Sequence, residues 1–382
     1  MHRDVPRIAR GACAASRACA ARPARRRFLA LALVLAAAAG PACRRDAAPP
    51  PVPAPKLEAE FLALGGIPVH VRAWDADPQV FGRVVEEYRA EVERQESILS
   101  VHRAGSTLSR LNRAGGAPVA VAGDTLRLLR RAAECAAETG GAFDPTVGPL
   151  LDAWKEAART GVEPSAARLA EALAGVGAQR VHVEGDERAG GTVRLDPPTT
   201  LDLGGIAKGW FADLGLARLR AAGIRRGLVE LGGDLALYDD RPRPEPFRIG
   251  VRDPDDPDGL LGRLRVERGS VVTSGDYERG YDVGGRRYNH IVDPRTGRPV
   301  AGLRAVTLWT LDGARADALA TAVMVLGERE GWAFVRRTPG VEAILVAADP
   351  SAPRGVRIRV TPGWQGRFEA HPAWRASLDP SP

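Results

Sequence analysis

Three short segments of this 382-residue chain carry side chains whose types and spacing suit phosphate and metal chemistry. The first, LDLGGIAKGWFAD (201–213), places Gly204, Gly205 and Lys208 where a predicted strand ends at Asp202 and a helix begins. Paired glycines let the backbone approach a ligand, and the free N–H groups at a helix start attract anions. A lysine in the first turn can reach a phosphate as a point charge. The segment fits a phosphate site, although a tight structural turn would use the same residues.

The second segment is ARADALATAVMVLG (314–327), which has the pattern of a helix. Asp317 and Thr321 are four residues apart and therefore share one helical face. A carboxylate and a hydroxyl on one face can give two oxygen ligands to Mg²⁺, a hard cation that prefers oxygen. The alternative is a solvated acid beside a threonine that hydrogen-bonds back to its own helix.

The third segment, VVTSGDYERGYDVGGRRYNHIVDP (271–294), predicts a hairpin that ends at His290. The residues that follow, Asp293-Pro294 and Thr296-Gly297, are typical of turns. A histidine at such a strand end can point out of the fold toward an active site. A purely structural role fits the same position.

A fourth segment, GGAFDPTVGPL (140–150), is irregular and glycine-rich. Asp144 opens a turn signal, and Ala142 and Phe143 could line a pocket for a ring. Phe143 fits the hydrophobic core equally well.

The elements that must position these residues alternate irregularly between helix and strand. Residues 61–74 predict a hairpin that turns at Gly65-Gly66. Helices are predicted over 78–98, 125–139 with Asp124 as its cap, 165–175, 206–222, 313–326 and 328–337. Strand-like runs cluster at 225–310 with helices on both sides, which favours an α+β fold with mostly antiparallel sheets.

The net charge of +7 is misleading as a guide to partners. Residues 1–42 hold eight arginines and one aspartate, so the remaining 46 basic and 46 acidic residues balance. The composition, with 45% hydrophobic and 26% charged residues, is that of a globular protein. A neutral body argues against nucleic-acid binding.

Residues 1–43 predict an export signal. A basic stretch is followed by an apolar run from Phe28 to Gly40, which is too short to span a bilayer. Arg25-Arg26 with Phe28-Leu29 resembles a twin-arginine signal, and Cys43 resembles a bacterial lipoprotein cleavage site. An ordinary signal with a chance cysteine is the alternative.

The rest of the chain divides into three predicted parts. Residues 44–58 are a Pro/Ala-rich linker that cannot pack. Residues 59–365 form one globular domain, and residues 366–382 a Pro-rich, loose tail.

Together these segments resemble the ApbE-type FAD:protein FMN transferases over roughly residues 59–350. The matching motifs, in the family's order, are SILSVHRAGSTLSRLN, GGAFDPTVGPL, LDLGGIAKGWFAD, LVELGGDL, TSGDYERGY, YNHIVDPRTGRPV and ADALATAVMVLG. The resemblance implies a T-fold-like α+β scaffold with FAD between two halves. It also implies Mg²⁺-dependent transfer of FMN to a threonine of a target protein, with release of AMP.

The resemblance also assigns roles to individual residues. The implied metal ligands are Asp317, Thr321 and the main-chain carbonyl of Gly205. The implied FAD contacts are His102, Ala142, Phe143, Asp144, Asp202, Lys208 and His290. His290 is implied as the catalytic base for the incoming hydroxyl. His102 stands where the family often has an aromatic side chain near the flavin, which makes it a weaker stacking platform.

The implied partners are FAD and an acceptor with a threonine-containing motif, expected to be a membrane electron-transfer protein. The expected location is the periplasmic side of a bacterial membrane, with a lipid anchor on Cys43. Two other functions fit the same residues: a Mg²⁺-dependent FAD pyrophosphatase that gives FMN and AMP, and a non-catalytic periplasmic flavin-binding lipoprotein.

Overall fold

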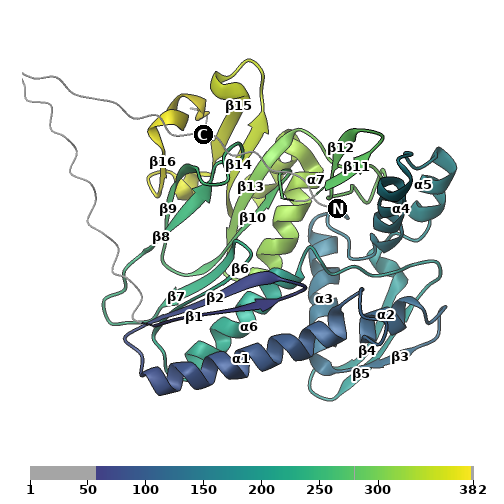
Figure 1. Cartoon of the computed structure of the whole chain (residues 1–382), viewed down its shortest axis with the longest axis horizontal. Helices are drawn as coiled ribbons and strands as arrows, with labels where there is room; N and C mark the ends of the chain where they lie inside the picture. Colours follow the sequence, from purple (N-terminus) through teal and green to yellow (C-terminus); the bar gives the residue numbers. More distant parts are fainter. Residues whose placement is uncertain (1–56, 279, 380–382) are drawn as a thin grey trace, which may run out of the picture. The chain divides into compact units, whose positions relative to one another are not determined.

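The computed structural model describes residues 57–278 and 280–379, all within one compact unit. The helices are α1 (Pro78–Leu99), α2 (Thr107–Asn112), α3 (Gly123–Glu138), α4 (Gly148–Thr160), α5 (Ala166–Leu173), α6 (Ala207–Ala221) and α7 (Gly313–Arg337). The strands are β1 (Leu57–Ala63), β2 (Ile67–Trp74), β3 (Val119–Val121), β4 (Val181–Asp186), β5 (Gly190–Leu195), β6 (Arg226–Leu231), β7 (Asp234–Asp239), β8 (Phe247–Arg252), β9 (Leu260–Val266), β10 (Gly269–Gly275), β11 (Gly280–Val283), β12 (Arg286–Asn289), β13 (Leu303–Thr310), β14 (Glu342–Ala348), β15 (Val356–Val360) and β16 (Phe368–Ala370). Figure 1 shows their arrangement.

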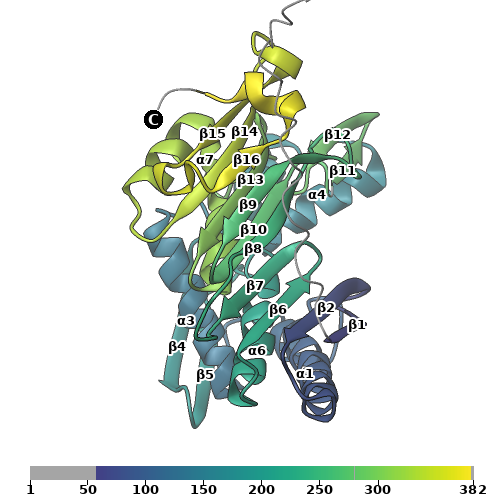
Figure 2. The same cartoon turned by 90° about the vertical axis from the view of Figure 1, so that its left-hand side faces the viewer.

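An eight-stranded sheet organises the fold, in the order β1-β2-β6-β7-β10-β13-β14-β15 (Figures 1 and 2). Its neighbouring strands pair antiparallel throughout. Helices α6 and α7 pack on one face, and the small sheet β16-β9-β8 packs on the other. The expected α+β class with mostly antiparallel sheets is therefore confirmed.

The large sheet has a hydrophobic core on each face, which explains why its central strands are nearly continuous runs of apolar residues. Side chains alternate between the faces of a strand, so both faces of a covered strand must be apolar. In β14, Leu345 belongs to the core under the helices, whereas Ile344 and Val346 belong to the core under the small sheet. In β6, Val229 and Leu228 divide in the same way.

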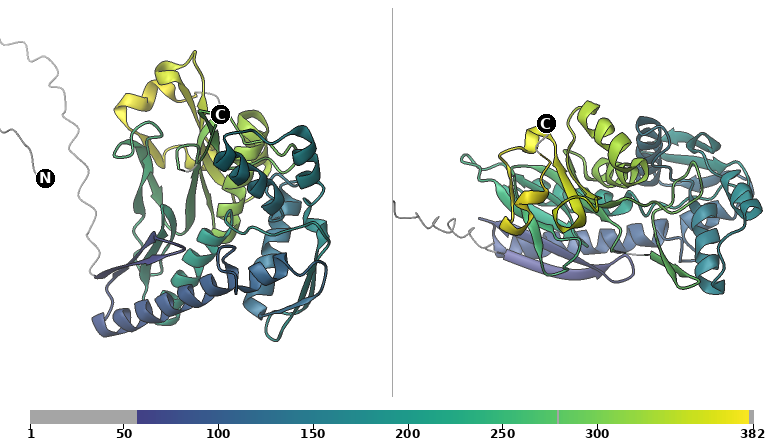
Figure 3. Two further views of the ribbon diagram at one scale, coloured as in Figure 1. Left: turned by 45° about the vertical axis from the view of Figure 1, so that its right-hand side comes forward. Right: turned by 90° about the horizontal axis from the view of Figure 1, so that it is seen from above.

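The remaining helices complete the walls around the sheet. Helix α1 runs alongside the β1–β2 hairpin (Figure 3). Helices α4 and α5 form a third core with the hairpin β11–β12, in which Trp154 packs at 5.0 Å from the ring of Tyr288. This contact fixes the hairpin that leads to His290.

Most predicted elements are present, including the β1–β2 hairpin and the helices over 78–98 and 206–222. The two helices expected over 313–326 and 328–337 are both present within the range labelled α7, because the helix breaks between them at Gly327, where φ is 73° and ψ is −177°. Helices α2 and α4 and the short strands β3, β15 and β16 were not predicted. Helix α2 and strands β3 and β16 have only three to six residues, too few for a clear hydrophobic period. Strand β15 (VRIRV) alternates and α4 has apolar residues at helical spacing, so both signals were present in the sequence and were overlooked.

Three predictions are wrong. Helix α3 begins at Gly123 with Ala122 as its cap, so Asp124 lies in the first turn, where it binds the Thr125 amide at 2.7 Å. Residues 201–203 are irregular, because the preceding strand β5 already ends at Leu195. The expected linker also ends earlier, since β1 begins at Leu57.

A fourth prediction, the loose tail, is also wrong. Strand β16 pairs with β9, and the 3₁₀ helix η4 (Pro372–Ser377) follows it. Trp374 is 1% exposed, and its indole N–H donates to Asp253 at 2.9 Å. Aromatic burial in the core beneath the small sheet therefore orders the chain to residue 379, despite its prolines.

The expected export signal, Cys43 and most of the linker lie outside the described residues. Within 57–278 and 280–379, no helix is both long and apolar enough to cross a membrane.

Candidate active site

A cavity of about 810 Å³ opens where α6, α7 and the hairpin β11–β12 converge. It is lined by every predicted site residue: His102, Ala142, Phe143, Asp144, Asp202, Gly205, Lys208, His290, Asp317 and Thr321. These residues come from segments more than 200 positions apart in the chain. The fold therefore brings the predicted residues together, while their individual roles stay predictions.

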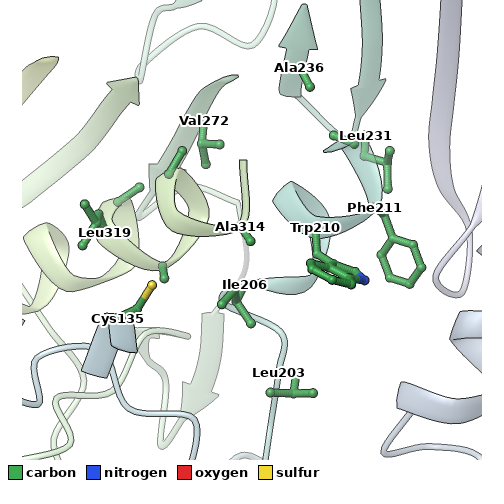
Figure 4. Close-up of a cluster of buried hydrophobic side chains, with 14 of the residues drawn as sticks. Cys135, Leu203, Ile206, Trp210, Phe211, Leu231, Ala236, Val272, Ala314 and Leu319 are labelled. Atoms are coloured by element: carbon green, nitrogen blue, oxygen red, sulfur yellow. The ribbon is translucent and has the colours of Figure 1, made fainter. Parts of the chain in front are cut away.

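Hydrophobic anchors hold the segment that carries Lys208. Ile206 and Phe211 have no exposed surface, and Figure 4 shows them with Leu203 and Trp210 among the buried side chains around α6. Helix α6 begins at Ala207, so Lys208 lies in its first turn as predicted. These anchors pack in the core, where Phe211 also reaches the cavity wall, and they leave the lysine at that wall.

A close crossing of α6 and α7 sets the lysine beside a carboxylate. A Cβ atom on Gly209 would lie 1.9 Å from the Gly313 carbonyl oxygen, so only glycine permits this approach. The Gly209 amide donates to Asp317 Oδ2 at 3.2 Å. The free N–H expected to attract an anion at this helix start is thus directed at a side chain of the protein.

Lys208 contacts two buried carboxylates. Its ammonium donates to Asp234 Oδ2 and lies 3.9 Å from Asp317 Oδ1. Asp234 is 1% exposed and Asp317 is 2% exposed. The alternative of a solvated Asp317 is therefore wrong.

This group has two acids and one base. Burial raises the pKa of Asp317 and of Asp234, and the nearby Lys208 ammonium only partly offsets this. Burial alone would lower the pKa of Lys208, but Asp317 and Asp234 outweigh it and hold the lysine charged. Two carboxylates share one ammonium, so the group carries an excess negative charge only when both are ionised, and the raised pKa values favour a proton on one of them.

Oxygen donors suited to Mg²⁺ lie around this group. Thr321 lies one helical turn beyond Asp317 on α7. A Cβ on Gly205 would lie only 3.2 Å from Thr321 Oγ1 and 3.3 Å from a ring carbon of Phe143. The bare backbone at Gly205 can therefore approach the threonine hydroxyl, and the donor set fits a hard divalent cation.

His290 enters the cavity from the hairpin side. It directly follows β12, as predicted, and is partly buried. Asn289 accepts a hydrogen bond from the Ile291 amide at 2.9 Å, which forms a tight turn around the histidine. The histidine is thus held by a local turn on a hairpin that packs against α4.

The residues expected to contact the flavin differ in their burial and in the hydrogen bonds that they already make within the protein. Phe143 is 4% exposed and belongs both to the core and to the cavity wall. Asp144 Oδ1 accepts from the Thr146 amide at 2.8 Å, and its Oδ2 accepts from the Ala178 amide at 3.0 Å. Both oxygens of Asp144 therefore already brace the loop, which favours a positioning role over direct contact with FAD.

Asp202 and His102 lie closer to solvent. Asp202 Oδ1 accepts from the Gly204 amide at 2.8 Å, which shapes the turn before α6. His102 is exposed in the loop after α1, where its amide donates to Ser100 Oγ at 3.2 Å.

The sequence-based site missed Asp234, Lys155, Ser274, Glu278 and Tyr281, which the structure also places at or beside this cavity. Asp234 follows two glycines in the segment LVELGGDL, which was noted only as a family motif. Unpaired buried charges are rare. If Asp317 is reserved for a metal ion, Lys208 needs another carboxylate as its partner, and this requirement could have pointed to Asp234.

Comparisons with known proteins agree with this site. Residues 66–345 match the model of the ApbE family. A "FAD:protein FMN transferase" of Treponema pallidum is 37% identical over 279 residues, which cover 69% of this chain and 77% of that protein. One of Rhodobacter capsulatus is 38% identical over 246 residues, which cover 64% of this chain but only 45% of that protein.

Solved structures show the same architecture. A crystal structure of the ApbE protein from Thermotoga maritima superposes with a TM-score of 0.70 at 30% identity, covering 81% of this chain and 98% of that one. The apo flavinyl transferase ApbE of Pseudomonas stutzeri gives 0.69 at 28% identity, with coverages of 82% and 97%. These relatives support the expected fold and the expected enzyme class, a transferase. The chain belongs to the ApbE family.

Proposed function

We propose that this protein is a Mg²⁺-dependent FAD:protein FMN transferase that acts on a threonine of a target protein. One observation carries the proposal: a single cavity unites a buried acid with adjacent oxygen donors, a charged lysine and a histidine. The names of the relatives from Treponema pallidum and Klebsiella pneumoniae support the same activity.

The proposed reaction breaks the phosphoanhydride bond of FAD and forms a phosphoester bond to the threonine. The threonine hydroxyl oxygen bonds to the phosphorus on the FMN side of the FAD pyrophosphate. The P–O bond to the AMP side breaks, and AMP leaves with the bridging oxygen. The hydroxyl proton passes to His290, which therefore acts as the base.

Phosphoryl transfer depends mostly on positioning and charge neutralisation, and this chain offers residues for both. Asp317, Thr321 and the Gly205 carbonyl would hold Mg²⁺, which when bound neutralises charge on the pyrophosphate oxygens. Lys208 would hold a further phosphate oxygen with its ammonium. Its pairing with two carboxylates keeps that ammonium protonated at neutral pH.

The flavin end of the substrate would occupy the apolar part of the cavity. Ala142 and Phe143 line this part, and the volume of about 810 Å³ falls in the range of pockets that enclose large ligands. Asp144 and Asp202 would keep the two flanking turns in place through their bonds to main-chain amides.

The proposal extends to location and partners. The predicted signal and Cys43 support an exported protein, lipid-anchored on the periplasmic side of a bacterial membrane. A threonine-bearing electron-transfer protein of that membrane is then within reach of the cavity as the acceptor.

The test combines FAD, Mg²⁺ and an acceptor domain bearing the threonine motif with the purified protein. In-gel flavin fluorescence of the acceptor and release of AMP would both appear, and both would disappear in EDTA. Free FMN with AMP and no labelled acceptor would support the pyrophosphatase instead. Bound FAD without AMP would leave a binding protein.

Replacement of His290 tests its assigned role. His290→Ala should lower the transfer rate by roughly 10²–10⁴-fold, because it removes the base. FAD affinity should change far less, since the pyrophosphate keeps Lys208. Equal losses of transfer and of FAD affinity would make His290 a binding residue. His182→Ala is a matched control, because that histidine lies on β4 and pairs with Asp196 at 2.9 Å, away from the cavity.

A further inference from the structure

Asp234 is the buried charge at the cavity that the proposed mechanism leaves without a task. It begins β7, directly after the turn that joins this strand to β6. Its Oδ1 accepts from the Thr273 amide at 3.3 Å, and its Oδ2 accepts from the Lys208 ammonium. Two elements of the large sheet therefore fix the carboxylate, and the carboxylate in turn fixes the lysine.

Asp317 has a similar arrangement with one difference. Its Oδ2 is bound by the Gly209 amide at 3.2 Å, whereas its Oδ1 has Lys208 at 3.9 Å. A direct ammonium–carboxylate hydrogen bond is shorter, about 2.7–2.9 Å. Lys208 thus bonds to Asp234 and stops short of the Asp317 oxygen that faces it.

This difference matters because an ammonium and a divalent cation compete for the same carboxylate oxygen. If Lys208 closed on Asp317, it would neutralise that carboxylate and place a positive charge where Mg²⁺ is expected. A buried lysine needs a carboxylate partner, since an unpaired buried charge is costly. When Asp234 supplies this partner, the Lys208 ammonium does not need a direct hydrogen bond to Asp317.

We propose that Asp234 is a positioning residue that holds the Lys208 ammonium off Asp317 and so keeps Asp317 available to a divalent cation. The inference rests on the proposed function, because that function assigns Asp317 to the metal. It adds a residue that acts on cation affinity only through Lys208.

The first test measures Mn²⁺ binding to the purified protein from the loss of the free-Mn²⁺ electron paramagnetic resonance signal. Asp234→Asn keeps the shape of the side chain and releases the lysine toward Asp317. We expect Mn²⁺ binding about tenfold weaker than in the wild type. Glu230→Gln is the matched control: it removes the same charge from the neighbouring strand β6, where the acid pairs with Arg72 at 3.5 Å outside the cavity. Its Mn²⁺ affinity should stay unchanged.

A double-mutant cycle separates this mechanism from a simple loss of negative charge. Lys208→Gln alone should bind Mn²⁺ more tightly than the wild type, because the competing ammonium is gone. In that background Asp234→Asn should weaken Mn²⁺ binding by less than about threefold. If the two effects are instead additive, Asp234 acts only through its charge and the inference is wrong.

The remaining outcomes are also decisive. Weaker Mn²⁺ binding in Lys208→Gln alone would overturn the inference even if Asp234→Asn did not fold. Asp317→Asn should abolish the site. If the wild type binds no Mn²⁺, or if Asp317→Asn binds it unchanged, the metal assignment in the proposed function falls and takes the inference with it. If the wild type binds Mn²⁺ in a way that depends on Asp317, but the effects of Asp234→Asn and Lys208→Gln are additive, the inference is wrong while the metal assignment stands.

Discussion

The two ends of strand β7 hold different electrostatic arrangements. At its start, the carboxylates of Asp234 and Asp317 share the single ammonium of Lys208. At its end, the guanidinium groups of Arg226 and Arg241 both bind the carboxylate of Asp239, and Arg241 also pairs with Asp75 and Glu245. Lys208 and Asp317 of the first group line the cavity, with Asp234 behind them, whereas no residue of the second group lies among its lining residues.

Short contacts surround the Asp239 carboxylate at the end of β7. Asp239 accepts from Arg226, from Arg241 at 2.8 Å and from the Glu245 amide at 2.9 Å. Arg226 is 2% exposed and also lies 4.0 Å over the ring of Phe247. Burial alone would raise the pKa of Asp239, but these donors outweigh it and hold the pKa well below its usual range.

The group at the start of β7 behaves in the opposite way. Burial and the second carboxylate raise the pKa of Asp234 despite its bond to Lys208. A protein built only for stability gains nothing from a second buried acid beside one lysine. Strongly perturbed groups in a cavity mark functional sites, so the two acids at one end of β7 indicate ligand binding and the well-bound carboxylate at the other indicates a structural role.

The largest expected effect breaks the Asp239 end. Asp239→Ala leaves Arg226 buried without its carboxylate, so the free energy of unfolding should fall by about 3–5 kcal/mol. Urea denaturation followed by circular dichroism measures this loss. Any folded fraction should still bind Mn²⁺, because the cavity group is untouched.

Asp240→Ala serves as the control for this prediction. Asp240 is the next residue and pairs with Arg220 at 3.0 Å, but both side chains are over 40% exposed. Removal of such a surface pair should cost only about 0–1 kcal/mol. Equal losses in the two variants would show that burial at Asp239 contributes little.

The next effect concerns pH, where the two ends should act with opposite signs. Between the folded and unfolded pKa values of Asp234, the folded state holds the extra proton, so stability should fall as pH rises above about 4. For Asp239 the unfolded state holds the extra proton, so stability should fall as pH drops below about 4. Each titrating proton changes the slope by up to about 1.4 kcal/mol per pH unit.

The measurement is the unfolding free energy across pH 3–8 in EDTA. Asp234→Asn should flatten the alkaline side of the profile, and Asp239→Asn should flatten the acidic side. Comparison with the wild type is required because burial also raises the pKa of Asp213 to about 7, which adds a slope of the same sign as Asp234. If the unfolding free energy of Asp234→Asn falls above about pH 4 as steeply as that of the wild type, Asp234 does not have the raised pKa on which the comparison rests.

The two ends of β7 were not equally predictable from sequence. Lys208 was identified because it follows two glycines at a predicted helix start. Asp317 and Thr321 were identified from their helical spacing. Asp239 and Arg226 were missed because arginine and aspartate are common here and only strand register makes them partners. They face each other because the β6–β7 turn pairs Arg226 with Asp239.

The same reasoning explains the other limits of prediction. Helices with clear periodicity, such as α1 and α6, were placed within two residues of their ends. The ordered C-terminal segment was missed because its order depends on the contact between Trp374 and Asp253, which are 121 residues apart. Local sequence patterns predict helices, strands and candidate site residues. Contacts between residues far apart in the sequence become visible only in the folded structure.

The smallest expected effect sharpens the comparison at the cavity. Asp317→Asn removes the surplus carboxylate, while the Asp234–Lys208 pair remains and the asparagine oxygen can still accept from Gly209. The free energy of unfolding should therefore stay unchanged or rise by about 1 kcal/mol, measured in EDTA. The same variant should lose its response to Mg²⁺ in the transfer assay, because a metal ligand is gone. A loss of several kcal/mol, like that expected for Asp239→Ala, would mean that Asp317 is a structural ion-pair partner and that the two ends of β7 are alike.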